Sequence, residues 1–99
     1  MNMQSLMAQA QKVQGDIKRK QEELNNMEFE GKSEWVTMTI SGKKEVKALN
    51  IDKTHVKDPE DLEMLEDMIV IAFNDAINKL EAETKAKLGM YGEGLSGLM

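Results

Sequence analysis

The side chains that most often carry out catalysis or bind metals are scarce in this chain. There is no cysteine and only one histidine, His55, so thiolate zinc sites, cysteine nucleophiles and histidine pairs are excluded. His55 has no nucleophile at motif spacing, and none of the four serines lies in a nucleophile-elbow motif. The sequence therefore predicts a protein that is not an enzyme, with no cofactor, no metal and no small-molecule substrate.

Two further patterns resemble ligand sites but lack the context that such sites need. The six acidic residues between positions 58 and 67 lack the spacing of a calcium loop, and we expect them to serve the start and solvated face of a helix. Residues 92–97 match the glycine spacing of dinucleotide-binding loops, but a predicted helix precedes them where that motif requires a strand. Neither pattern predicts a ligand.

Basic side chains form the remaining candidate site. Four lie within nine residues near the N-terminus and three lie toward the end of the last predicted helix, although the whole chain has a net charge of −5. If the two helix ends project side by side, they form basic prongs that contact DNA phosphates with little sequence preference. From composition alone, lysines that only solubilise a helix face are the simpler alternative. The predicted DNA-binding residues are Lys12, Lys18, Arg19, Lys20, Lys79, Lys85 and Lys87.

The first element that must position these groups is a predicted helix over residues 3–27. Its apolar residues recur at alternating spacings of three and four, as in a heptad repeat. Gly15 weakens this helix by about 1 kcal/mol relative to alanine. A stripe this long fits packing on the chain's own sheet or packing shared with a partner helix. It consists of Met3, Leu6, Ala10, Val13, Ile17, Leu24 and Met27, with Met7 beside it.

A three-stranded antiparallel meander is predicted next, over residues 28–32, 35–40 and 45–52. The turn between the second and third strands contains Gly42, which is free to adopt a positive φ. Apolar residues of the third strand change parity, from Val46 and Ala48 to Leu49 and Ile51, which predicts a β-bulge near Ala48 that brings both pairs to one core face.

The last predicted element is a helix over residues 59–88. Asp58 and Pro59 form a start signal, a wide apolar face follows, and Gly89 is the stop. We expect one domain over residues 1–89 and a flexible glycine-rich tail over residues 90–99. The order of elements predicts an α+β fold with an α-β-β-β-α protomer, in which two long helices flank the meander.

The lengths of the two predicted helices favour a homodimer. They span about 37 and 45 Å, whereas a compact globule of about 100 residues is only roughly 33 Å across. The helix ends should therefore overhang the sheet, and they carry apolar residues that a second copy can cover. The predicted interface residues are Met3, Leu6, Met7, Ala10, Leu80 and Leu88.

The sequence contains no recognisable signal peptide or membrane-spanning segment. Its longest apolar run is residues 68–73, far short of the roughly 20 residues that cross a bilayer. We therefore expect a cytoplasmic protein that is not bound to membranes.

Three stretches resemble the bacterial YbaB/EbfC family of nucleoid-associated proteins. Residues 3–14 read MQSLMAQAQKVQ, and residues 36–52 contain V-x-x-T-I-x-G followed by V-x-x-L-x-I-D. Residues 58–89 read DPEDLEMLEDMIVIAFNDAINKLEAETKAKLG, in which residues 63–67 and 72–76 are the most family-like.

The resemblance implies a cytoplasmic homodimer that binds double-stranded DNA, with the helices of a tweezer-shaped dimer as gripping elements. It implies a role in nucleoid organisation and gene regulation, and no catalytic activity or cofactor. No residue-level DNA motif comes with it, so the basic site residues above rest on charge and geometry.

Two other functions remain open at the level of the sequence. The acidic balance and the methionine-rich stripes fit a protein–protein interaction module without direct DNA binding. Met1, Met3, Leu6 and Met7, followed by a basic stretch, also fit an amphipathic helix that lies on a membrane surface.

Overall fold

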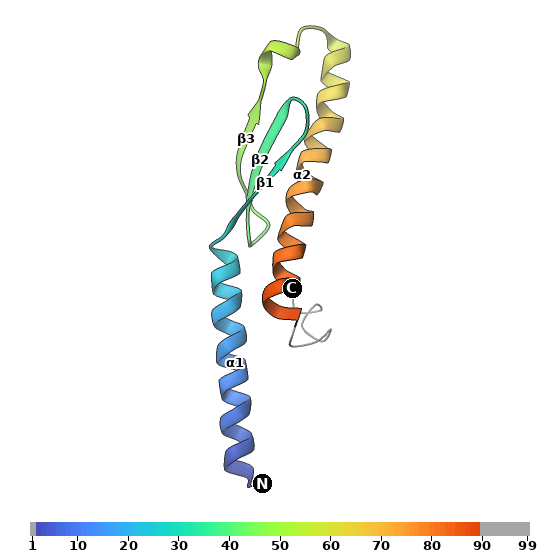
Figure 1. The fold of residues 1–99 in the computed structure, drawn as a ribbon. Coiled ribbons are helices and arrows are strands. Elements are labelled where there is room, and N and C mark those ends of the chain that lie inside the picture. The colour runs from blue at the N-terminus through green and yellow to red at the C-terminus, as the bar shows by residue number, and fades with distance from the viewer. Residues whose placement is uncertain (1, 90–99) are drawn as a thin grey trace.

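The fold is a three-stranded sheet with one long helix packed across it and a second helix that extends away from it. A computed structural model describes residues 2–89, and the tail and glycine motif considered above lie outside these residues. The elements are α1 (Met3–Asn25), β1 (Glu28–Lys32), β2 (Val36–Ser41), β3 (Val46–Ile51), the short 3-10 helix η1 (Lys53–His55) and α2 (Pro59–Leu88) (Figure 1). The predicted α-β-β-β-α order and α+β class are confirmed.

The sheet is antiparallel, with strand order β1-β2-β3. Between Thr39 and Ile40 the register with β3 shifts by one residue, because Ile40 pairs with Val46 while Thr39 pairs with Ala48. The predicted bulge is thus confirmed. It places Val46 and Leu49 on the same face of the sheet as Ile40, but Ala48 faces the other way with Thr39, contrary to the prediction.

The turn after β2 differs from its prediction. The residue with positive φ is Lys44, at 67°, and not Gly42. Gly42 is needed for another reason: a Cβ there would collide with the backbone of Leu24 and Asn25 at the end of α1. Its N–H also donates to the Met27 carbonyl at 3.0 Å, so the turn is fixed against the end of α1.

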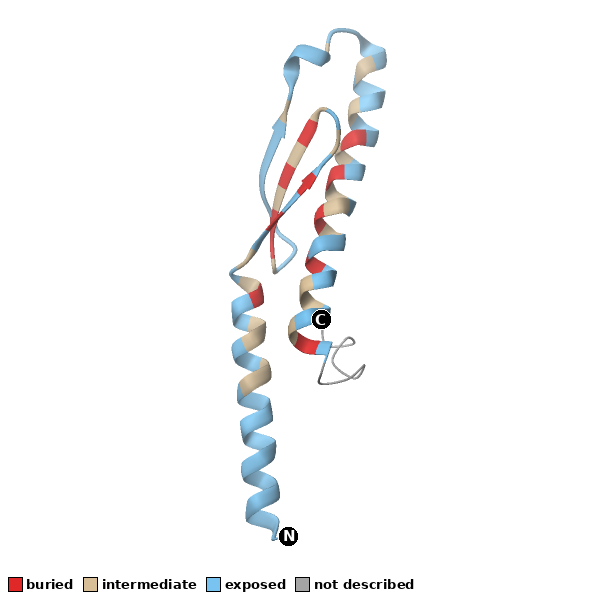
Figure 2. Ribbon diagram, viewed as in Figure 1, coloured by how far each residue is buried: buried red, intermediate tan, exposed pale blue. Residues whose placement is uncertain are grey.

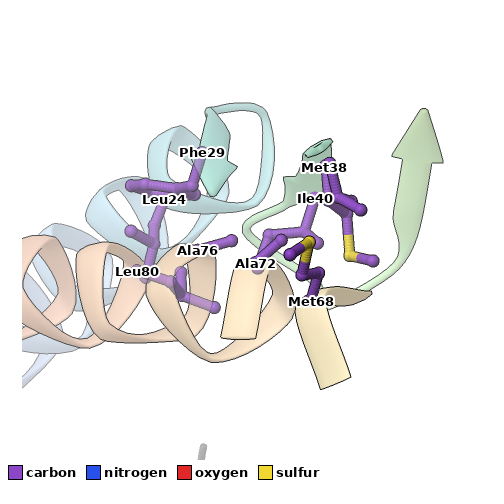
Figure 3. Packing of buried hydrophobic residues seen from close by; sticks show 9 residues of the cluster. Leu24, Phe29, Met38, Ile40, Met68, Ala72, Ala76 and Leu80 are labelled. Atoms are coloured by element: carbon purple, nitrogen blue, oxygen red, sulfur yellow. The ribbon is translucent and has the colours of Figure 1, made fainter. Parts of the chain in front are cut away.

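The core lies between α2 and the first two strands (Figure 3). Ala72 and Ala76 of α2 are fully buried against Gly31 of β1, where an added Cβ would collide with the Ala72 carbonyl oxygen. Small residues on both elements therefore let helix and strand approach closely. The other buried core residues are Leu24, Phe29, Val36, Met38, Ile40, Met68 and Leu80.

The start of α2 is fixed by the predicted signal. Pro59 occupies the first helical turn, and the Asp61 carboxylate accepts backbone N–H groups from Lys57 at 2.9 Å and Asp58 at 3.0 Å. These hydrogen bonds lower the pKa of Asp61 below its usual value of 3.8. A charged Asp61 thus holds the connection from η1 into α2.

The two helices differ in how far they are covered. Residues 2–15 of α1 are exposed throughout, and α1 packs on α2 only toward its C-terminal end (Figure 2). The expected overhang is confirmed for α1, which gives the molecule extents of 71 × 20 × 15 Å. The end of α2 also extends past the sheet, beside α1 (Figure 1), but Leu80 and Leu88 are only 2% and 3% exposed and offer almost no surface there.

Candidate nucleic-acid interface

α1 carries exposed cations along its length, and two of them, Lys12 and Lys18, form no ion pair within residues 2–89. Among residues 2–89, no carboxylate lies within ion-pair distance of Lys12 or Lys18, and both side chains are exposed. Residues 2–15 contain no acidic side chain, and four of them are glutamines. Lysine and glutamine are side chains that commonly contact DNA phosphates.

Arg19 lies seven residues after Lys12, so both are on the face of α1 opposite the apolar stripe. The Arg19 guanidinium is 3.3 Å from the Asp16 carboxylate, but its side chain is 64% exposed. Exposed ion pairs of this kind contribute roughly 0–1 kcal/mol, so the guanidinium remains available to another anion. Lys20 is half-buried and lies closer to the packed end of the helix.

The predicted basic residues of α2 divide into two kinds. Lys79 donates from Nζ to the Glu30 carbonyl at 2.6 Å and pairs with Asp75 at 3.3 Å, so it ties α2 to β1. Lys87 is 25% exposed and pairs with Glu23 of α1 at 3.5 Å, which ties the two helices together. Lys85 is exposed. Two of the three cations therefore also serve the fold.

Asp75 and Lys79 close the outer edge of the sheet at β1. The Asp75 carboxylate accepts the backbone N–H of Lys32 at 3.0 Å, while Lys79 binds the Glu30 carbonyl. The Lys32 N–H, followed by Lys79, lowers the pKa of Asp75 below 3.8. The other edge strand is β3, and within residues 2–89 no side chain from another element hydrogen-bonds its outer backbone groups in this way.

Exposed apolar side chains lie on α1 and β3, and α2 also exposes Leu62, Met64, Val70 and Ile71 by 48–57%. Met3, Leu6 and Met7 of the predicted interface are 76%, 47% and 60% exposed, and Ala10 is exposed. Leu80 and Leu88 have almost no surface left, because they are buried within the protomer. The sequence analysis did not single out β3, where Val46 and Leu49 are 52% and 44% exposed.

His55 has a local structural role. Its ring stacks on Trp35 with centroids 5.3 Å apart and an interplanar angle of 5°, and its Nε2 lies 3.3 Å from the Asp52 carboxylate. Hydrogen bonds from Thr54 lower the pKa of Asp52. Within residues 2–89 no group of acidic and histidine side chains is arranged to hold a metal ion, and no helix there is long and apolar enough to cross a membrane.

The sequence matches the model of the YbaB/EbfC DNA-binding family over residues 1–95. It is 46% identical to a nucleoid-associated protein of Enterococcus faecalis, over 97% of this chain and 93% of that protein. It is 48% identical to a nucleoid-associated protein of Lactococcus lactis subsp. cremoris, over 96% of this chain and 97% of that protein.

The fold also resembles that of a solved structure. The crystal structure of an uncharacterized protein from Helicobacter pylori matches with a TM-score of 0.74, over 93% of this chain and 99% of that one. The two sequences are 22% identical, so this likeness concerns the fold.

Proposed function

The chain belongs to the YbaB/EbfC DNA-binding family, and on that premise we propose that it is a cytoplasmic, nucleoid-associated protein that grips duplex DNA as a homodimer. Contact is made mainly to phosphates, so sequence preference is modest. The protein organises the nucleoid, influences gene expression and carries out no catalysis.

The observation that carries the DNA contact is the projecting part of α1. Lys12 and Lys18 are exposed on it without an ion-pair partner among residues 2–89, and Arg19 is held only by a surface pair. Exposed cations that make few contacts within their own protomer can bind a polyanion without displacing internal contacts. Lys20 of α1 and Lys79, Lys85 and Lys87 at the adjacent end of α2 complete the proposed site.

The homodimer is proposed from the uncovered apolar surface. Val46 and Leu49 lie on the same face of the sheet as the buried side chains of β2. On that face α2 covers β1 and β2 but leaves β3 uncovered. A second copy presents the same face, so an isologous contact covers both at once. The exposed stripe of α1, with Met3, Leu6, Met7 and Ala10, extends this surface along the overhang.

DNA binding is tested by fluorescence anisotropy of a labelled duplex of about 40 base pairs at several salt concentrations. We expect binding that weakens with salt, because each phosphate contact releases counterions and adds about 0.9 to the log–log slope. In the double variant Lys12→Gln/Lys18→Gln the slope should fall by about 2.

The matched control is Lys53→Gln/Lys57→Gln, which makes the same change in net charge near the start of α2. Its slope should equal that of the unmodified protein. Absence of binding at low salt would contradict the proposed function and leave the interaction-module alternative. Sedimentation equilibrium should give twice the chain mass of 11.2 kDa, and a single-chain mass at all concentrations would contradict the homodimer.

A further inference from the structure

The turn between β2 and β3 brings two more lysines beside the C-terminal end of α1. Lys43 and Lys44 are exposed, and neither has an ion-pair partner among residues 2–89. Neighbouring Lys47 pairs with Glu45 at 3.4 Å, so residues 43–47 carry an excess of two positive charges. In the sequence these lysines are about 25 residues away from the basic segment of α1.

The turn is held in one conformation by its own hydrogen bonds. The buried Ser41 side chain accepts the backbone N–H groups of Lys43 at 3.2 Å and Glu45 at 3.3 Å through its Oγ, and its carbonyl accepts that of Lys44 at 2.9 Å. Gly42 is fixed against the end of α1, as described above. The two lysines therefore project from a rigid support and need no ordering of the backbone to bind an anion.

The contact between Gly42 and the end of α1 also places the turn beside one face of that helix. Lys18 and Asn25 are seven residues apart, which places them on the same helix face about 10 Å apart along the axis. Gln21 lies between them and donates from Nε2 to the Asn25 Oδ1 at 3.0 Å. Asn25 then lines a polar pocket of about 210 Å³ together with Lys43 and Lys47. Lys18, Gln21, Asn25 and Lys43 thus follow one continuous surface.

We propose that the β2–β3 turn is a separate contact for the phosphate backbone of duplex DNA, with Lys43 and Lys44 as its cations beside Lys18 of α1. The inference rests on the proposed function and extends the binding surface from the helices to the sheet. Glu28 and Glu45 also line the pocket and would repel an anion inside it, so the proposed contact is to the exposed Lys43 and Lys44 side chains and not within the pocket.

The test is the double variant Lys43→Gln/Lys44→Asn, measured against Lys53→Gln/Lys57→Gln. Asparagine is chosen at position 44 because it tolerates the positive φ found there. Both variants change the net charge equally, and Lys53 and Lys57 follow the end of β3 that is opposite the β2–β3 turn. The measurement is the anisotropy titration of the 40-base-pair duplex over a series of salt concentrations.

We expect the log–log salt slope to fall by about 2 in the turn variant and to stay unchanged in the control. The single variant Lys43→Gln, which leaves the backbone at position 44 untouched, should lower the slope by about 1. A turn variant with the slope and affinity of the control would overturn this inference while leaving the proposed function intact. If the unmodified protein fails to bind at low salt, the proposed function fails and this contact fails with it.

Discussion

One half of this molecule, the packed half, is well covered by its own protomer, whereas the other half, the open half, leaves its side chains exposed. In the packed half, α2 lies across β1 and β2, the edge of β1 is closed by Asp75 and Lys79, and the C-terminal part of α1 is joined to α2. In the open half, residues 2–15 of α1 are exposed, and β3 presents apolar side chains that α2 leaves uncovered.

The difference between the two halves indicates which residues determine the free energy of unfolding and which are available for binding. Burial of apolar surface on folding is concentrated in one layer between a helix and two strands, which sets the free energy of unfolding. The open half contributes little to that layer, so its residues are available for DNA and for a second copy. Substitutions in the two halves should therefore have different readouts.

The largest effect is expected from Gly31→Val. A side chain at position 31 collides with the backbone of Ala72 and Ala76, and neither helix nor strand can withdraw without opening the core. We expect a loss of at least about 3 kcal/mol in unfolding free energy, measured by urea denaturation and circular dichroism.

The control for this glycine is Gly15→Ala in the open half. Nothing lies within 4 Å of a Cβ added at position 15, so the helix should gain about 1 kcal/mol. Equal unfolding midpoints for the two variants would mean that α2 and β1 do not approach as described.

The next largest difference in stability is expected between two leucine substitutions, one in each half. Leu80→Ala leaves a cavity in the core and should lower the unfolding free energy by about 2–5 kcal/mol at every protein concentration. Leu6→Ala removes an exposed side chain and should act only through the dimer, as a transition that depends more strongly on concentration. Similar losses that are independent of concentration would refute the division into two halves.

The sequence and the structure agree where local patterns decide the outcome. The start signal at Asp58 and Pro59 and the helical apolar pattern predicted the limits of α2, and the parity change in the third strand predicted the bulge. Close contacts between distant segments were not predictable. The need for Gly31 and Gly42 depends on which backbone lies opposite each glycine, and a single sequence does not contain that information.

The candidate site was predictable to a smaller extent. Charge alone pointed to Lys12, Lys18 and Arg19, and the structure leaves them exposed on α1. It could not show that Lys79 binds a strand carbonyl or that the turn lysines lie beside α1, because both facts depend on tertiary packing. Leu80 and Leu88 were assigned to an interface because an apolar stripe does not reveal which of its residues the protomer itself covers.

The smallest expected effect concerns the closed edge of β1. The pKa of Asp75 is lowered in the folded protein, so its contribution to stability is present above its ordinary value of 3.8 and is lost as the pH falls through the folded pKa. Asp75→Asn should lower the melting temperature slightly at pH 7, and the difference from the unmodified protein should shrink toward pH 3. A constant difference between pH 7 and pH 3 would show that the Asp75 charge has no part in closing the edge.

The most direct test of the central claim is hydrogen–deuterium exchange of the protein with and without duplex DNA, followed by peptide mass spectrometry. The claim is that the exposed basic side chains of α1 and the β2–β3 turn, and not the acidic start of α2, contact DNA. We predict that peptides from α1 and the β2–β3 turn gain protection with DNA, while peptides from the acidic start of α2, residues 58–67, do not change. Protection confined to residues 58–67, with α1 unchanged in a demonstrably DNA-bound sample, would contradict the account.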